Sequence, residues 1–447
     1  MLSNEEQTLF YRLAAFQGSR TIEAVESVCC FDLTLDVLNG LDSLCSKNLV
    51  QQEIGLDGES RFYLLETIHE YLIHRLRNSG EAEQIFQRHA KYFIELAENG
   101  KYPTRGGPEQ ITWLKRLEAD HDNLRASRDW AISSGNMAEA LRLVGSLDFF
   151  WLRMGSFDEG LNWVKASLEF IDEAPASVRA SVYGAAGEIL SFVDEDHDKS
   201  IEYYERAIDI YQKLGNKREI GWTSARVIYS YMMVSDIDAV QNYGKKSIKL
   251  LSEVGDNIGI AHALTIVGLH EYLSNQLIGA KTIFEEALSI ARENHDRLRE
   301  SISLLNLASV KFKEGDAKCA NRLFKESLKV QIDIGHSRHS GTGLLSYLAG
   351  TAVALNQPRR AVKLLGAEEN QYIRRGYNPQ PHQSKMFQDY LSEAQLQLGS
   401  KAFEQAWSEG KAMSYDQAIA FALEISKIES FDVDPVTDPN IISGKDF

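Results

Sequence analysis

The chain has 447 residues and repeats itself at intervals of 40 residues along its middle part. Two series of positions carry this period, and both consist mostly of small residues. The first series is Gly160, Ser200, Val240, Ala280, Ala320 and Arg360, and the second is Ser167, Ala207, Ser247, Ala287, Ser327 and Ala367. A fixed period of roughly 20–50 residues indicates stacked helical or strand units instead of a single globular core. Such arrays usually present surfaces that bind other molecules.

Each period predicts two helices between about residues 137 and 375, the first followed by a short turn and the second by a longer one. The longer turns carry Gly215, Gly255 and Gly335, and glycine suits the left-handed end of a helix. The first helices share a small residue every 40 positions, which favours close approach of neighbouring helices. These residues are Ser181, Gly221, Ala261, Ser301 and Gly341.

The first 80 residues have a different pattern. Apolar residues at helical spacing predict helices over 5–16 and 33–46, and Thr21 is suited to cap a helix between them. Extended segments at 49–54 and 61–65 are joined by Gly-Leu-Asp-Gly, which predicts a hairpin, and a helix over 67–77 follows. Three helices, a hairpin and a further helix predict a winged-helix-like unit.

Charge and composition limit the functional classes. The formal net charge is −16, and residues 1–100 hold 8 Lys and Arg against 16 Asp and Glu. A protein that binds nucleic acid is expected to show a basic stripe, which this sequence lacks. No apolar run of membrane-spanning length and no basic secretory signal is visible, and four cysteines are too few for a disulfide framework. We therefore expect a cytoplasmic protein.

These patterns predict five segments and a mostly all-α fold. They are a winged-helix-like domain at 1–80, a helical connector at 81–136, the repeat array at 137–375, a C-terminal helical cap at 376–428 and a disordered acidic tail at 429–447. The array is expected to form an α-α superhelix.

The repeats resemble tetratricopeptide repeats. The unit at 260–299 shows this best, through Leu264, Gly268, Ala280, Phe284 and Ala287, although its period exceeds the usual value of about 34 residues. The strings LSNEEQTLFYRLAAF, RFYLLETIHEYLIHRL, WLKRLEADHDNLRASRDWAI and LGSKAFEQAWSEGKAMSYDQAIAFALE are similar to one bacterial family. That family is the predicted signal-transduction ATPases of the NB-ARC or STAND type, LuxR/AfsR-like regulators with a winged helix and a tetratricopeptide array.

The sequence departs from this family in the ATPase motor. No phosphate-binding loop of the form GxxxxGK[ST] occurs, and the nearest string, Gly244-Lys245-Lys246-Ser247, has Ala239 where the first glycine belongs. The resemblance implies a histidine contact to nucleotide near Leu65, which the sequence does not supply. Because Met1 falls where the motor is expected to have ended, we expect the motor to be encoded separately or cut off.

No residue pattern predicts catalysis or metal binding. His69 and His74 are five residues apart, so on a helix they point in different directions and are not expected to share a metal ion. The adjacent Cys29 and Cys30 favour buried packing over redox chemistry, and the polar cluster Glu118, Asp120, His121 and Asp122 favours helix packing over acid–base work. We expect no enzyme activity, no cofactor and no metal.

The remaining candidate is a groove on the concave side of the array, where the first helix of each repeat is expected to lie. Aromatic and Met side chains there would bind a protein or peptide partner, although each residue is also suited to inter-helix core. The candidates are Trp222, Tyr229, Met232, Met233, His262, Thr265, Leu269, Tyr272, Leu305, Ser309, Phe312 and Lys313.

Three hypotheses follow. The first is a non-enzymatic regulatory scaffold, the sensor-arm portion of a signal-transduction regulator, with a separately encoded ATPase or DNA-binding domain as a further candidate partner. The second is a DNA-binding regulator that acts through the winged helix, against which Asp36 and Asp42 in the expected recognition helix argue. The third is an ATP-hydrolysing enzyme, for which the residues offer no nucleotide site. For this chain alone we expect neither a membrane nor a nucleic acid as partner.

Overall fold

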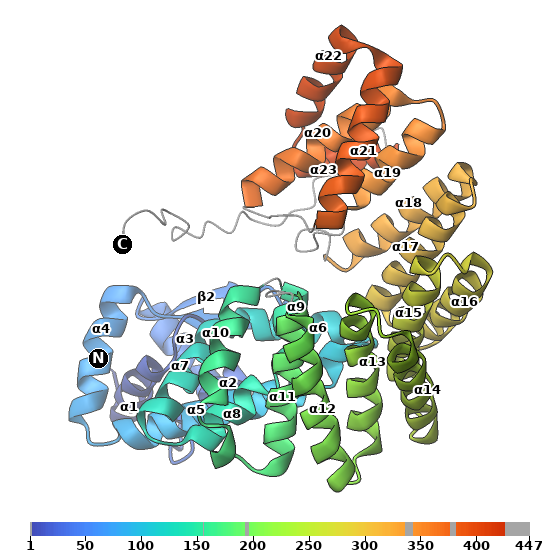
Figure 1. Ribbon diagram of the computed structural model, residues 1–447. Helices are drawn as coiled ribbons and strands as arrows, with labels where there is room; N and C mark the ends of the chain where they lie inside the picture. Colours follow the sequence, from blue (N-terminus) through green and yellow to red (C-terminus); the bar gives the residue numbers. More distant parts are fainter. Residues whose placement is uncertain (1, 155, 193–195, 336–342, 376–380, 425–447) are drawn as a thin grey trace, which may run out of the picture. The chain divides into compact units, whose positions relative to one another are not determined.

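The computed structural model describes residues 2–154, 156–192, 196–335, 343–375 and 381–424 (Figure 1). These residues form 23 α-helices and one small three-stranded sheet, which confirms the mostly all-α fold with repeats. The chain divides into two compact units. Unit 1 comprises Met1–Leu307 and Val330–Ser340, and unit 2 comprises Ala308–Lys329 and Gly341–Phe447. The helix α17 (Arg297–Lys313) contains the division, whereas the five predicted segments stay predictions.

Unit 1 begins with the elements that the sequence predicted. They are α1 (Asn4–Arg12), α2 (Ile22–Cys29), α3 (Val37–Ser46), the hairpin β2 (Gln51–Ile54) and β3 (Ser60–Tyr63), and α4 (Glu66–Asn78). The Thr21 hydroxyl accepts from the Ala24 N–H at 3.2 Å and so caps α2 as expected. The sequence missed β1 (Arg20–Thr21), which pairs antiparallel with β3 and gives the order β1-β3-β2. A two-residue strand has too short an alternation to be seen in sequence.

The connector holds α5 (Ala82–Gly100), the 3-10 turn η2 (Pro103–Arg105), α6 (Gln110–Ala119) and α7 (His121–Ser133). It leads to α8 (Met137–Val144), α9 (Asp148–Met154), α10 (Phe157–Leu168) and α11 (Ala176–Phe192). One hydrophobic core extends from Leu9 in α1 to Ile189 in α11. The N-terminal elements and the start of the array are therefore packed together.

The array shows its period in the helix bounds. The helices α12 (His197–Lys213), α13 (Lys217–Met233), α14 (Ile237–Glu253), α15 (Asn257–Leu273), α16 (Leu277–Glu293) and α17 are each 17 residues long. Each begins 20 residues after the one before it, so all turns between them have three residues and the expected longer turn does not exist. The middle turn residue has positive φ at Gly215, Ser235, Gly255, Asn275 and His295.

The residue after each left-handed position begins the next helix. Asn216, Asp236 and Asp256 accept a hydrogen bond from the backbone N–H three residues later, at 3.2, 3.0 and 2.9 Å. The predicted small residues allow the helices to pack closely, since a Cβ at Gly221 would lie 2.7 Å from Leu251 Cγ. Gly341 lies outside the described residues.

In unit 2, α20 (Pro358–Arg375) packs against α19 (Leu344–Ala354), α21 (Pro381–Leu398), α22 (Ser400–Lys411) and α23 (Tyr415–Leu423). The helix α18 (Ala317–Asp333) contains the other division between the units. A Cβ at Gly410 would lie 2.4 Å from the Lys363 carbonyl oxygen, so α20 and α22 approach at backbone distance. The described part of the predicted C-terminal cap at 376–428 holds the helices α21, α22 and α23, and the predicted acidic tail at 429–447 lies outside the described residues.

Candidate functional site

The predicted groove residues fall into three groups. Three of them are buried: Trp222, His262 and Thr265. The half-buried ones are Tyr229, Met232, Leu269, Tyr272, Leu305, Ser309 and Phe312, and the exposed ones are Met233 and Lys313. Leu305 and the residues before it belong to unit 1, while Ser309, Phe312 and Lys313 belong to unit 2. A binding role for the accessible residues stays a prediction.

The three buried residues do not form an open groove, because other parts of the chain cover Trp222 and His262. The ring of Phe149, on α9, lies 5.7 Å from Trp222 and 6.2 Å from His262 between ring centres. Trp222 and His262 stack on each other at 5.0 Å. Thr265 lies one turn further along α15 and donates to the Ala261 carbonyl at 2.7 Å. Sequence periodicity gave no signal for this packing, because α9 comes from outside the regular repeats.

The loop between α5 and α6 also enters the array. Arg105 donates two hydrogen bonds to the Glu219 carboxylate on α13, at 2.9 and 3.0 Å, and both side chains are buried. Burial opposes ionisation of Glu219, but Arg105 and Lys101 overcome this effect and lower its pKa to about 2. A Cβ at Gly106 would lie 2.3 Å from Asp296 Oδ2, so a side chain there would displace the Asp296 carboxylate where the loop meets the start of α17. The sequence identified this segment as a linker but not as part of the interior.

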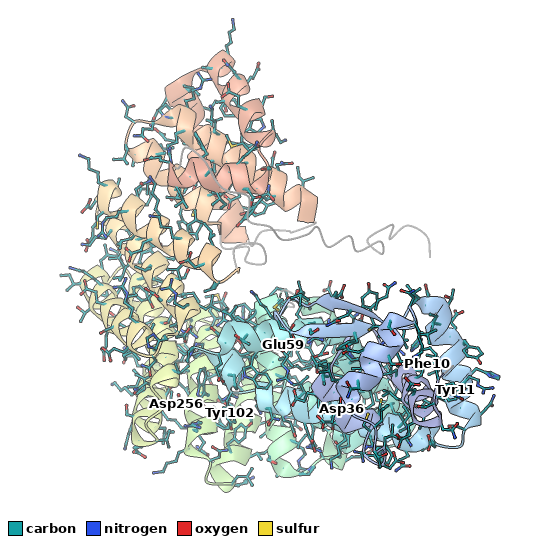
Figure 2. The ribbon with its side chains drawn as sticks, turned by 180° about the vertical axis from the view of Figure 1, so that it is seen from behind. Phe10, Tyr11, Asp36, Glu59, Tyr102 and Asp256 are labelled. Carbon is teal, nitrogen blue, oxygen red and sulfur yellow. The ribbon has the colours of Figure 1, made fainter. Side chains whose placement is uncertain are left out.

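The outer edge of the same loop is accessible. Tyr102 is 46% exposed, and the guanidinium groups of Arg105 and Arg218 lie 5.0 and 5.8 Å from its ring centre. Arg218 also pairs with Asp256 at 3.0 Å, which joins the loop to the turn before α15 (Figure 2). These contacts hold the loop from its exposed side.

A second buried ion pair lies beneath Phe149. Arg226 on α13 contacts Asp148 at 2.8 Å and Glu188 at 2.5 Å, and it donates to the Gly184 carbonyl at 3.1 Å. The Tyr204 hydroxyl donates to Glu188. Because burial of charge is costly unless partners satisfy it, this network fixes α9, α11 and α13 relative to one another.

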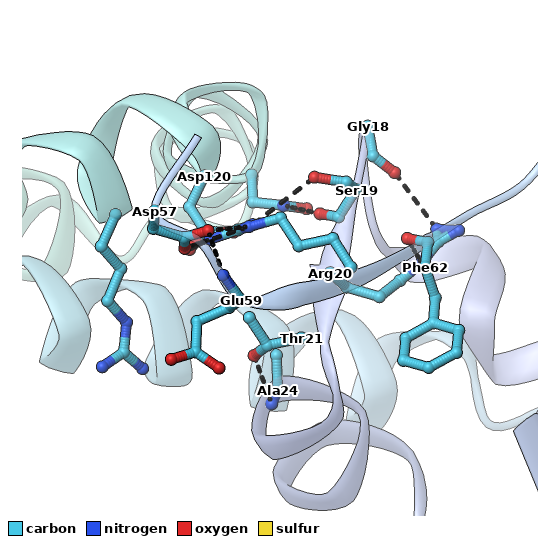
Figure 3. Close-up of polar contacts among 12 residues, drawn as sticks. Gly18, Ser19, Arg20, Thr21, Ala24, Asp57, Glu59, Phe62 and Asp120 are labelled. Atoms are coloured by element: carbon cyan, nitrogen blue, oxygen red, sulfur yellow. Dashed lines mark hydrogen bonds and ion pairs between the residues drawn. The ribbon is translucent and has the colours of Figure 1, made fainter. Parts of the chain in front are cut away.

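Polar contacts also fasten the N-terminal elements to the connector. Arg61 on β3 pairs with Asp57 of the hairpin loop at 2.5 Å and with Asp120, between α6 and α7, at 2.8 Å (Figure 3). Asn123 on α7 accepts from the Gln17 N–H at 2.8 Å and donates to the Ser19 carbonyl at 2.8 Å. The sequence favoured helix packing for Asp120, whereas its partner in the structure is Arg61 on β3.

The exposed side of the N-terminal elements is acidic. Asp36 and Asp42 of α3 and Glu53 and Glu59 of the hairpin are exposed (Figure 2 labels Asp36 and Glu59). Between residues 33 and 63 the only cations are Lys47, which pairs with Glu6 at 3.5 Å, and the buried Arg61. This face would repel a phosphate backbone.

Other residues considered from the sequence have structural partners in the described part of the chain. Gly244 and Ser247 lie inside α14, where the Ser247 hydroxyl donates to the Gly221 carbonyl at 2.8 Å. His69 contacts the Ala14 carbonyl and His74 contacts Asn78, so the two rings have separate partners. Throughout the described part of the chain, no three potential ligands gather to hold a metal ion, and no helix is long and apolar enough to span a bilayer.

No family model matches this chain. Three mycobacterial proteins are 36% identical to it over 171 residues: "Putative HTH-type transcriptional regulator Mb0914c" of Mycobacterium bovis and two proteins of the same description from Mycobacterium tuberculosis strains. The match covers 38% of this chain and 19% of each relative, so the chain spans about a fifth of the length of the curated relatives.

Two solved structures are similar at 15% identity. The match with BtubC from P. vanneervenii covers 51% of this chain and 91% of the BtubC chain, with a TM-score of 0.38. The STAND protein with a tetratricopeptide repeat sensor from Pyrococcus horikoshii covers 95% of this chain and 65% of its own, with a TM-score of 0.49. Scores this low carry no argument about role.

Proposed function

We propose that this chain is the non-enzymatic regulatory segment of a transcription regulator, in which the repeat array controls the position of the winged-helix-like N-terminal elements. A partner that binds the array would alter the packing of its helices, and the connector would pass that change to residues 1–80. An ATPase motor or a DNA-binding domain would produce the output.

The observation that carries this proposal is a pair of buried ion pairs, one at each end of the segment that holds α6. Glu219 of α13 binds Arg105, which lies in the loop between α5 and α6. At the other end of α6, Asp120 binds Arg61 of the hairpin. Two buried ion pairs on one short connecting segment give a mechanical route from the array to the N-terminal elements.

The relatives support a role in regulating transcription, because their names describe HTH-type transcriptional regulators. The finer assignment, to NB-ARC or STAND-type regulators of the LuxR/AfsR-like branch, rests on the sequence strings of the N-terminal and C-terminal segments. The same strings support the interpretation of residues 1–80 as a winged-helix-like unit. In that family, such a unit follows the ATPase motor.

The test is a transcript profile of cells that carry the gene with Arg105→Ala and Glu219→Ala together. We expect a defined set of transcripts to change, because the array and the N-terminal elements are uncoupled. The control is Arg206→Ala, which removes an exposed cation from α12. An unchanged profile at equal protein level would contradict the proposal.

The alternative is direct DNA binding by the winged-helix-like elements, which the names of the relatives favour. The acidic face of α3 and the hairpin opposes it. Fluorescence anisotropy of labelled duplex DNA at physiological salt separates the two. Saturable binding that Lys47→Ala weakens would replace our proposal with the alternative, and saturable binding of labelled ATP would replace it with the enzyme hypothesis.

A further inference from the structure

Six buried polar atoms without hydrogen-bond partners belong to one group of neighbouring residues in unit 1. They are Arg153 Nε, both ring nitrogens of His262, Asp296 Oδ2, Arg299 Nε and Ser303 Oγ. Folded proteins leave few buried polar groups unsatisfied, and each one is costly because its hydrogen bonds to water are lost. Several at one place mark a site where ordered water or a bound molecule supplies the missing partners.

Three helices contribute these residues. Arg153 lies on α9 with its guanidinium 6.0 Å from the Phe149 ring centre, and His262 on α15 faces the same ring. Arg299 and Ser303 lie one turn apart on α17, after Asp296, which caps that helix through the Arg299 N–H at 2.9 Å. The electrostatic influences agree with this proximity. After burial, Arg299 is the largest cause of the lowered pKa of both Arg153 and His262.

Two arginines of this group differ from the neighbouring arginines in the partners that they have. Arg226 has Asp148 and Glu188 as partners, and Arg105 has Glu219. Within the described residues, neither Arg153 nor Arg299 forms an ion pair, although Asp296 acts electrostatically on both and Glu188 acts on Arg153. Two guanidinium groups therefore lack a directly bound carboxylate.

We propose that this cluster, defined as Arg153, His262, Arg299 and Ser303, binds the oxyanion group of a small metabolite, a carboxylate or a phosphate. Guanidinium forks match both groups, because each offers paired oxygen acceptors. His262 is uncharged at neutral pH, since burial and then Arg299 and Arg153 hold its pKa well below the usual value, and one of its nitrogens is a donor. The Ser303 hydroxyl supplies a further donor.

The position of the cluster suits a small ligand better than a peptide. His262, Asp296, Arg299 and Ser303 are each at most 7% exposed, so no extended chain reaches them. Arg153 is half-buried, and therefore the cluster meets solvent along this side chain. This inference does not rest on the proposed function, since binding is measurable whether or not the array regulates a partner.

The test uses the full chain and two probes, inorganic phosphate and acetate. Sodium chloride at equal ionic strength is the control. We expect the thermal unfolding midpoint of the wild type to rise with at least one probe and to saturate. Tryptophan fluorescence should titrate in parallel and lose most of its change in Trp222→Phe, because Trp222 stacks on His262. Response to phosphate alone, to acetate alone or to both identifies the group that is bound.

Arg153→Met and Arg299→Met should each weaken binding roughly tenfold or more, since each removes a charged hydrogen-bond donor. Without probe, Arg299→Met should be at least as stable as the wild type, because it removes a buried cation that lacks an ion pair. The matched control is Arg206→Met, an exposed arginine on α12 that should bind as the wild type does. If Arg299→Met does not fold, binding of the probes by Arg153→Met and Ser303→Ala tests the proposal instead. A wild type without a saturable response, or cluster variants that respond as strongly as it does, would overturn the proposal.

Discussion

Arg105 and Glu219 are 114 residues apart in sequence, yet their side chains meet through two parallel hydrogen bonds in the interior of unit 1. Trp222 and Phe149 lie next to this pair, with the Arg105 guanidinium 5.1 and 5.8 Å from their ring centres. An arginine from an irregular loop thus occupies the part of the array where an open groove was expected. Side chains from other segments of the same chain therefore fill part of the interior of the array.

Breaking this pair on one side should destabilise unit 1 strongly. Arg105→Ala leaves the Glu219 carboxylate buried without its main partner, and we expect a loss of about 3–5 kcal/mol. Replacing both, as Arg105→Met with Glu219→Leu, should cost much less because no charge stays unpaired. Urea unfolding followed by circular dichroism measures both. Arg218→Ala, whose side chain is 46% exposed, should cost less than about 1 kcal/mol.

Two glycines of α11 should respond in opposite ways to alanine. A Cβ at Gly187 would lie 2.8 Å from the Tyr204 ring, so Gly187→Ala forces the ring to move and should cost about 1–3 kcal/mol. At Gly184 the nearest atom would be Arg226 Nη1 at 3.7 Å, and Gly184→Ala should stabilise the helix by about 0.5–1 kcal/mol. Equal unfolding midpoints for the two variants would contradict the close packing of α11 on α12.

Unit 2 should lose stability as pH rises from about 5 to 7. Burial raises the pKa of Glu368 from 4.5 to about 7, although Ser346 and Tyr372 oppose the shift. The folded state therefore holds its proton over a range in which the unfolded state releases it, and the stability present below pH 4.5 is lost through pH 7. We expect a change on the order of 2 kcal/mol.

Hydrogen exchange of α19 and α20 measures this effect at pH 5 and pH 7, after correction for the intrinsic exchange rates. Glu368→Gln keeps the shape of the side chain and removes its charge, so its protection should be nearly the same at both values. A wild type whose corrected protection in these helices does not depend on pH would rule out the buried acid as the cause.

Unit 1 should show the opposite dependence at acid pH. His89 on α5 is buried between Phe16 and Phe93 and contacts Asn123 at 3.2 Å. Burial lowers its pKa to about 4, so between pH 6.5 and 4 the unfolded state binds a proton that the folded state does not. The contribution of His89 to the free energy of unfolding is fully present above pH 6.5. It falls by roughly 2 kcal/mol towards pH 5. In thermal unfolding, His89→Gln should lose this part of the dependence, while His270→Gln, a half-buried histidine on α15, should retain it.

Local signals in the sequence were enough to locate most elements. Thr21 marked the start of α2, and the Gly-Leu-Asp-Gly string marked the hairpin. The 40-residue period gave the pairing of helices, although not the equal length of the turns, because Ser235 and Asn275 take the left-handed conformation that glycine takes elsewhere. The strand β1 was missed because its two residues are extended only through pairing with β3.

The sequence by itself determined the repeat and the helix bounds, because caps, left-handed turn residues and apolar spacing act over a few neighbouring residues. Only the tertiary structure decided which side chains fill the interior of the array. Phe149 reaches Trp222, and Arg105 reaches Glu219, only after separate segments fold onto the same helix. Such contacts depend on burial and charge pairing over long sequence separations, and no periodicity along the chain records them.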